Sequence, residues 1–142
     1  PHFLEAGVDV DLMMGSAYGF TSPVKTFADT LYLKAKMKKG DSLSTPNSEQ
    51  MAIYVVSGEV KIEDKVVSAY EMAILEEKEV ATLYANQDSL IAIVGGEKMP
   101  KRYIEWNFVS SRKERIEQAK QDWQGQRFPK VPGDEEEYIP LP

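Results

Sequence analysis

The chain has 142 residues, of which 17 are basic and 23 acidic, with a formal net charge of −6 and no cysteine. A chain of this length can bury a core of its own, and its charge excludes the broad basic surface that nucleic acids require, so we expect no direct nucleic-acid contact. The lack of cysteine excludes disulfides and thiolate metal sites and suits a reducing cytoplasm, where we expect the protein to reside.

Short apolar or alternating runs, separated by turn residues, fill the first 110 residues. The predicted strands are 8–14, 27–37, 51–56, 59–63, 66–67, 71–75, 80–85, 90–94 and 102–109. In the longest, every second residue from Leu31 to Met37 is apolar, which places one face of the strand in the core. Many short strands at this spacing indicate an all-β sandwich or barrel, and composition does not separate the two.

The apolar period changes from 2 to about 3.6 after residue 110, which predicts one helix over residues 111–125. Ser111 and Glu114 have the spacing of a capping box, and Gly125 supplies a left-handed stop. The narrow apolar stripe of this helix ends at Trp123. We predict that Trp123 packs the helix against the β domain.

Four prolines punctuate the last segment, residues 126–142, and predict an extended chain. Phe128, Tyr138 and Ile139 provide apolar anchors along it, beside the acidic run from Asp134 to Glu137. One interpretation is that this tail lies along a partner surface. The other is a disordered acidic end.

Several phrases of the chain are characteristic of a known family. They are GSAYGFTSPVKT (residues 15–26), MAIYVVSGEV (51–60), WNFVSS (106–111), RIEQA (115–119), PGDEE (132–136) and IPLP (139–142). Together they resemble the carboxy-terminal domain of the pirin family, whose members contain two cupin domains in tandem. The resemblance implies a cupin-type β-barrel or jelly roll at 1–110, a packed helix at 111–125 and an extended Pro-rich tail at 126–142.

The resemblance also implies a longer protein. We expect residues before Pro1 and an amino-terminal cupin domain beside this one. Pirin-like proteins bind iron through three histidines and a glutamate of that first domain. Some act as transcriptional co-regulators, and others resemble quercetin 2,3-dioxygenases.

The cupin metal site requires two histidines at i and i+2, a glutamate a few residues later and a third histidine on another strand. Aligned on Gly40 and Gly58, the first three positions fall at Pro46, Ser48 and Met51, and the second motif would need a glycine near Tyr70 and a histidine beyond it. None of these ligands is present. We therefore predict no metal, no cofactor and no catalytic residue in this chain, and iron only in a first domain.

The remaining candidates each have two interpretations. His2 is the only histidine, and it is either a ligand or acid–base group donated across a domain boundary or a solvated terminal residue. Met51, Ile53 and Val55 share one face of a central strand, where they either fill the barrel interior or line an open pocket. Lys34, Lys36, Lys38 and Lys39 fit a solvated strand face better than a nucleic-acid contact.

Three functions therefore remain open. The chain is a metal-free structural and interaction domain that pairs with a first cupin domain, with Trp123, Phe128, Tyr138 and Ile139 as anchors. Alternatively, it is the non-catalytic half of a quercetin-type dioxygenase. The third hypothesis is a stand-alone binding module that forms a homodimer. No run of about 18 apolar residues is present, and we predict no membrane span.

Overall fold

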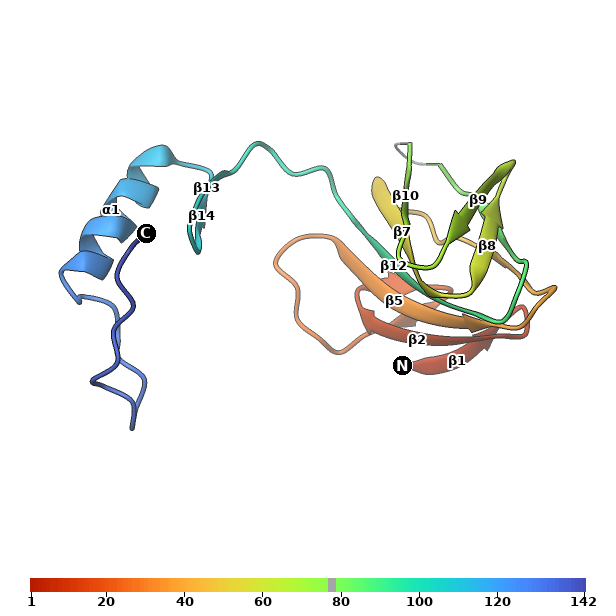
Figure 1. Cartoon of the computed structure of the whole chain (residues 1–142), viewed down its shortest axis with the longest axis horizontal. Coiled ribbons are helices and arrows are strands. Elements are labelled where there is room, and N and C mark those ends of the chain that lie inside the picture. Colours follow the sequence, from red (N-terminus) through yellow and green to blue (C-terminus); the bar gives the residue numbers. More distant parts are fainter. Residues whose placement is uncertain (77–78) are drawn as a thin grey trace. The chain divides into compact units, whose positions relative to one another are not determined.

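The computed structural model describes residues 1–76 and 79–142 of the chain (Figure 1). It divides into two compact units, Pro1–Lys98 and Met99–Pro142. The first unit contains the large sheets, and the second contains a small hairpin, one helix and the tail. None of the helices in the described part of the chain has the length and apolar content needed to cross a bilayer.

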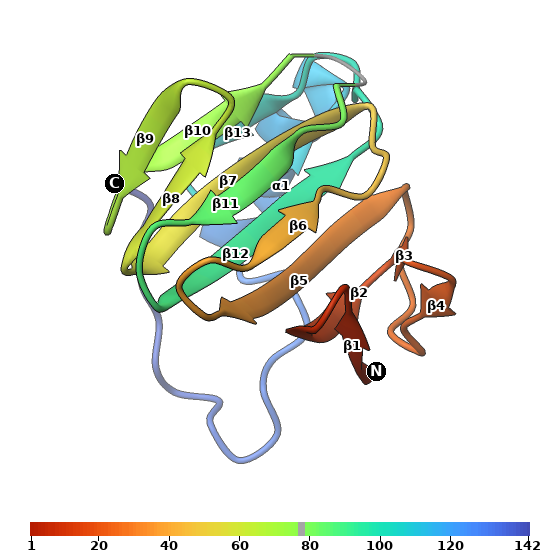
Figure 2. The same cartoon turned by 90° about the vertical axis from the view of Figure 1, so that its right-hand side faces the viewer.

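Two antiparallel sheets form the body of the first unit (Figures 1 and 2). The larger sheet has the order β1 (His2–Glu5), β2 (Val8–Met14), β5 (Thr30–Met37), β12 (Ser89–Gly96), β7 (Gln50–Ser57) and β10 (Met72–Leu75). The smaller has the order β6 (Ser42–Ser44), β11 (Thr82–Ala85), β8 (Glu59–Ile62) and β9 (Lys65–Ser68). A short hairpin, β3 (Ser16–Ala17) with β4 (Phe20–Thr21), follows β2.

The core of this unit consists of the inward faces of both sheets. The alternation predicted for residues 31–37 is confirmed, because each of its apolar residues is buried. Val60 and Leu83 of the smaller sheet join the same apolar cluster. The sharp turn between β7 and β8 needs Gly58, whose φ of +81° is a conformation that other residues rarely adopt.

The second unit begins with a hairpin of β13 (Tyr103–Glu105) and β14 (Phe108–Ser110). The prediction of one strand over 102–109 is therefore wrong. Trp106 has a φ of +50°, which reverses the chain between the two short strands. Hairpin turns with positive φ are usually recognised in a sequence by Gly, Asn or Asp, so a large aromatic residue at this position gives no signal of the turn.

The helix α1 (Lys113–Gln124) follows β14, but its predicted ends are wrong in detail. Its N-cap is Arg112, whose guanidinium has no acceptor for the first helical amides, so there is no side-chain cap bond. The backbone N–H of Arg112 donates to the Ser110 hydroxyl at 3.1 Å. Gly125 does end the helix, with φ −82°, but the left-handed residue is Gln126, with φ +50°. Residues 126–142, all of which the structure describes, form no helix or strand apart from an isolated bridge between Val131 and Asp134.

Candidate functional site

The positions at which a cupin would carry metal ligands lie at the start of β7 and just before it. Pro46 and Met51 are buried, and Ser48 is half-buried. The Ser48 hydroxyl donates to the carbonyl oxygen of Gln50 at 3.0 Å, so its polar group is already used by the backbone. A proline ring, a hydroxyl with a backbone partner and a thioether do not make a site for a hard or borderline metal ion. These residues do not fit the iron that the cupin resemblance implies.

The strand β7 points its alternate side chains into the core. Met51 is 4% exposed, and Ile53 and Val55 are fully buried. In the described part of the first unit, no polar or charged residue other than Ser22, Thr45 and Ser89 is buried. Thr45 accepts a hydrogen bond from the backbone N–H of Ala81, so its hydroxyl belongs to the fold rather than to a reaction centre.

His2 lies on the outer face of the larger sheet, on the edge strand β1. Its Nδ1 is 2.9 Å from Asp11 and 3.3 Å from Asp9, both on β2. The register explains the cluster, because His2 is opposite Asp11 and Asp9 is two residues away on the same face. Lys34 also contacts Asp11, at 3.1 Å. The hydrogen bond from Lys34 is the main reason that the pKa of Asp11 is lowered, and the hydrogen bond between His2 and Asp11 is the second reason.

This cluster could offer one imidazole and two carboxylates to a cation. Its ligand atoms lie within 4.8 Å of one another, but Lys34 already neutralises part of their charge. The strand predicted at 8–14 carries Asp9 and Asp11, but the strand that pairs His2 with them was not predicted from the sequence. The segment HFLE gave no clear alternation, because Leu4 is apolar although it is 70% exposed, and four residues are too few to define a pattern.

The lysines of the β5 region are partly matched by acids. Lys34 pairs with Asp11, and Lys38 lies 3.4 Å from Asp88. The backbone N–H of Lys39 donates to Asp88 at 2.9 Å and is the main cause of the lowered pKa of that carboxyl. These contacts pair two of the four lysine side chains with carboxylates, which reduces the positive charge of this surface.

The second unit brings the predicted anchor residues together around Trp123. Its ring centroid lies 5.0 Å from that of Trp106, 5.8 Å from that of Phe128 and 6.0 Å from that of Tyr138. The indole N–H donates to the carbonyl oxygen of Ile139 at 2.7 Å, which ties the end of the tail to α1. These ring contacts and this hydrogen bond all lie within the second unit.

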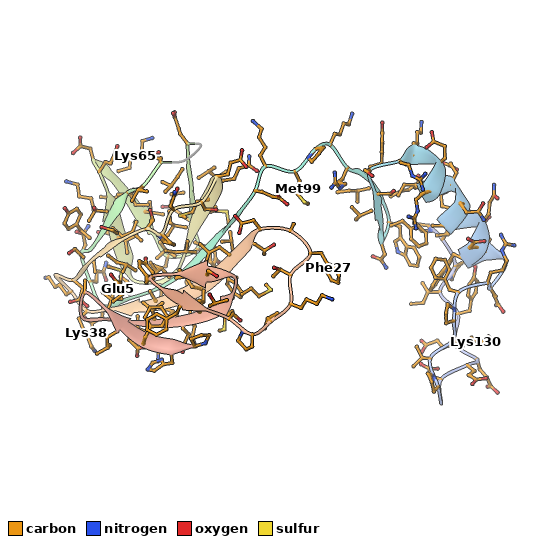
Figure 3. All side chains as sticks on the ribbon, turned by 180° about the vertical axis from the view of Figure 1, so that it is seen from behind. Glu5, Phe27, Lys38, Lys65, Met99 and Lys130 are labelled. Carbon is orange, nitrogen blue, oxygen red and sulfur yellow. The ribbon has the colours of Figure 1, made fainter. Side chains whose placement is uncertain are left out.

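A pocket of about 610 Å³ opens beside this aromatic cluster, between the end of α1 and the tail. Trp123, Phe128 and Tyr138 line it, together with the acidic run from Asp134 to Glu137 and Lys130. Figure 3 shows the side chains of this segment around the labelled Lys130. The aromatic anchors and the acidic run were each evident in the sequence. The sequence did not show that the tail returns to the end of α1 and forms a pocket there.

Comparisons with known proteins identify the family and the fold of the chain. A model of the pirin C-terminal cupin domain matches residues 32–129. A pirin-like protein of Caulobacter vibrioides is 34% identical over the whole chain, which covers 50% of that protein. A Pseudomonas aeruginosa protein, provisionally named as a quercetin 2,3-dioxygenase, is 27% identical over 75% of the chain and 38% of its own length.

The solved structure of a quercetin 2,3-dioxygenase from Acinetobacter baumannii has the same fold. It superposes on this chain with a TM-score of 0.84 at 17% identity, covering 100% of this chain and 50% of that one. At this identity the likeness concerns the fold, which is of the expected cupin type. The chain spans at most half the length of each of these three relatives.

Proposed function

Because this chain belongs to the pirin family, as a carboxy-terminal cupin domain, we propose that it is a metal-free module that pairs with a metal-binding cupin domain. The observation that carries the proposal is the content of the barrel interior. Where a metal-binding cupin has imidazole and carboxylate groups, this chain has Pro46, Ser48 and Met51, and Met51 is part of the apolar core.

The exposed apolar residues of the tail support a role in association. Phe128 and Tyr138 are 40% exposed and Ile139 is 59% exposed, although their neighbours hold them in a defined arrangement. Fixed apolar groups lose little conformational freedom on binding, so they are suited to a contact surface. We propose that they are the anchors through which the tail holds the paired domain.

A second candidate concerns the protein as a whole. The names of the Pseudomonas and Acinetobacter relatives favour a quercetin-type dioxygenase. In that case the iron and the substrate would be held by a different domain, and this chain would support it without taking part in the reaction. Iron-dependent oxygen uptake with quercetin by the two-domain protein, lost on chelation, would support this candidate.

Association with a partner domain is measured directly by sedimentation velocity. The probe is the half of the Caulobacter relative that this chain does not match, expressed alone and loaded with iron. We expect a one-to-one complex. Ile139→Ser should weaken it, whereas the matched variant Ile74→Ser, at a residue 80% exposed on the edge strand β10, should not.

Two other results contradict the proposal. If both proteins are folded and remain separate, this chain is not a pairing module for such a domain. If this chain instead sediments as a homodimer that excludes the added domain, it is a stand-alone module in which two copies replace the tandem arrangement.

A further inference from the structure

The pocket of the second unit combines an aromatic wall, formed by Trp123, Phe128 and Tyr138, with an acidic rim, formed by residues Asp134 to Glu137. We infer that it binds an arginine- or lysine-bearing segment on the surface of the paired cupin domain. This inference rests on the proposed pairing and adds to it the chemistry by which the tail recognises its partner.

The aromatic wall offers ring faces rather than polar groups. The indole N–H of Trp123 is already bonded to the Ile139 carbonyl oxygen, so this residue can offer a ligand only its ring atoms. Tyr138 is stacked near that indole with an angle of 26° between the rings, and Phe128 meets it at 62°. A cation over such faces is attracted by the ring quadrupole, and its apolar stem gains contact area.

The rim sets the sign of the ligand charge. Four consecutive carboxylates, Asp134 to Glu137, line the pocket with Lys130 as the one cation among its lining residues. The ammonium group of Lys130 donates to the backbone carbonyl oxygen of Glu135 at 2.9 Å. The nearby pair of Arg127 with Asp122, at 2.6 Å, lies outside the lining and leaves the rim charge unchanged.

These two features select among possible occupants. An anion would meet the carboxylates, and a neutral apolar ligand would leave them without a counter-charge. A guanidinium or ammonium group on a long apolar stem satisfies both, with the stem against the rings and the charge at the rim. The space of about 610 Å³ is larger than a single small cation needs, so a ligand that fills it also brings an apolar part to the rings.

The first test uses isothermal titration calorimetry on the full chain with three acetylated and amidated peptides, ARLRLRA, AQLQLQA and AELELEA. We expect binding of the arginine peptide alone. Raising the salt concentration from 50 to 500 mM should weaken it by about tenfold, because exposed charges are strongly screened at the higher ionic strength.

The second test removes the rim charges without changing the shape of the side chains. The variant Glu135→Gln, Glu136→Gln, Glu137→Gln should weaken peptide binding by about tenfold and should also weaken association with the paired domain. The control variant Glu63→Gln, Asp64→Asn, Glu97→Gln changes the net charge equally at exposed residues of the first unit, and it should leave both affinities unchanged.

The outcomes separate this inference from the proposed function. If the glutamine variant pairs with the cupin domain as tightly as the wild type, the pairing stands and the inference fails. It also fails if the acidic peptide binds equally well, or if tetramethylammonium displaces the arginine peptide and so identifies a small-cation site. Peptide binding that does not compete with the paired domain would assign the pocket to a different protein and overturn the inference.

Discussion

Replacing Ile53 with alanine tests whether the barrel interior is filled. The side chain is fully buried in the centre of β7. Removing its three outer carbons costs about 2.4 kcal/mol of transfer free energy, at about 0.8 kcal/mol for each methylene-sized group. A cavity of roughly 60 Å³ adds about 1.5 kcal/mol if the neighbours relax only in part. The free energy of unfolding should therefore fall by about 4 kcal/mol.

Urea denaturation followed by far-UV circular dichroism measures this change, provided that the slope of the transition stays constant. Ile74→Ala is the matched control, because the same atoms are removed from a side chain that is 80% exposed. It should cost less than about 1 kcal/mol. A loss below about 1.5 kcal/mol for Ile53→Ala would refute the reasoning, since it would mean that water already reaches the interior.

Three further perturbations follow from particular contacts. Trp123→Ala should lower the opening free energy of α1 by about 2–3 kcal/mol, because a half-buried ring and one hydrogen bond are lost. Amide hydrogen exchange measures this change. Trp123→Phe should recover about half of the loss, and equal losses for the two variants would contradict the prediction. The pKa of Asp11 is lowered mainly by the hydrogen bond from Lys34. The ionised Asp11 therefore stabilises the fold fully at a pH above 3.8, the ordinary pKa of an aspartate, and this stabilisation is lost as the pH falls through the lower pKa of the folded state. Asp11→Asn should therefore flatten the acid side of a plot of urea midpoint against pH, and an unchanged plot would contradict this. Gly58→Ala should cost about 2–4 kcal/mol in urea denaturation, because φ is +81° and a Cβ would lie 2.4 Å from the Asp88 carbonyl oxygen; a neutral effect would contradict the turn geometry.

The fold could be predicted from the sequence wherever a repeated pattern was present. The alternating apolar residues of β5 identified both the strand and its buried face, and the segment Val8–Met14 has the predicted limits. The helix near residues 111–125 was recognised by its change of period. In each case the signal extended over several residues and reflected burial of one face.

Features that depend on one or two backbone angles were not predictable. The turn at Trp106 and the left-handed Gln126 both place ordinary side chains at positive φ, where tertiary packing overrides local preference. The His2 cluster required the pairing of β1 with β2, and the aromatic pocket required the tail to return to α1. Such contacts between distant parts of a chain leave no periodic pattern in it.

The iron content of the chain is the measurement that tests its proposed metal-free character most directly. The protein is incubated anaerobically with excess Fe(II), passed through a desalting column and measured by inductively coupled plasma mass spectrometry, with a His2→Ala variant to remove the surface cluster. We predict fewer than about 0.1 iron atoms per chain for both proteins, because the cupin ligand positions carry Pro46, Ser48 and Met51. About one iron atom per chain, retained in the His2→Ala variant, would contradict the proposal and place a metal site inside this domain.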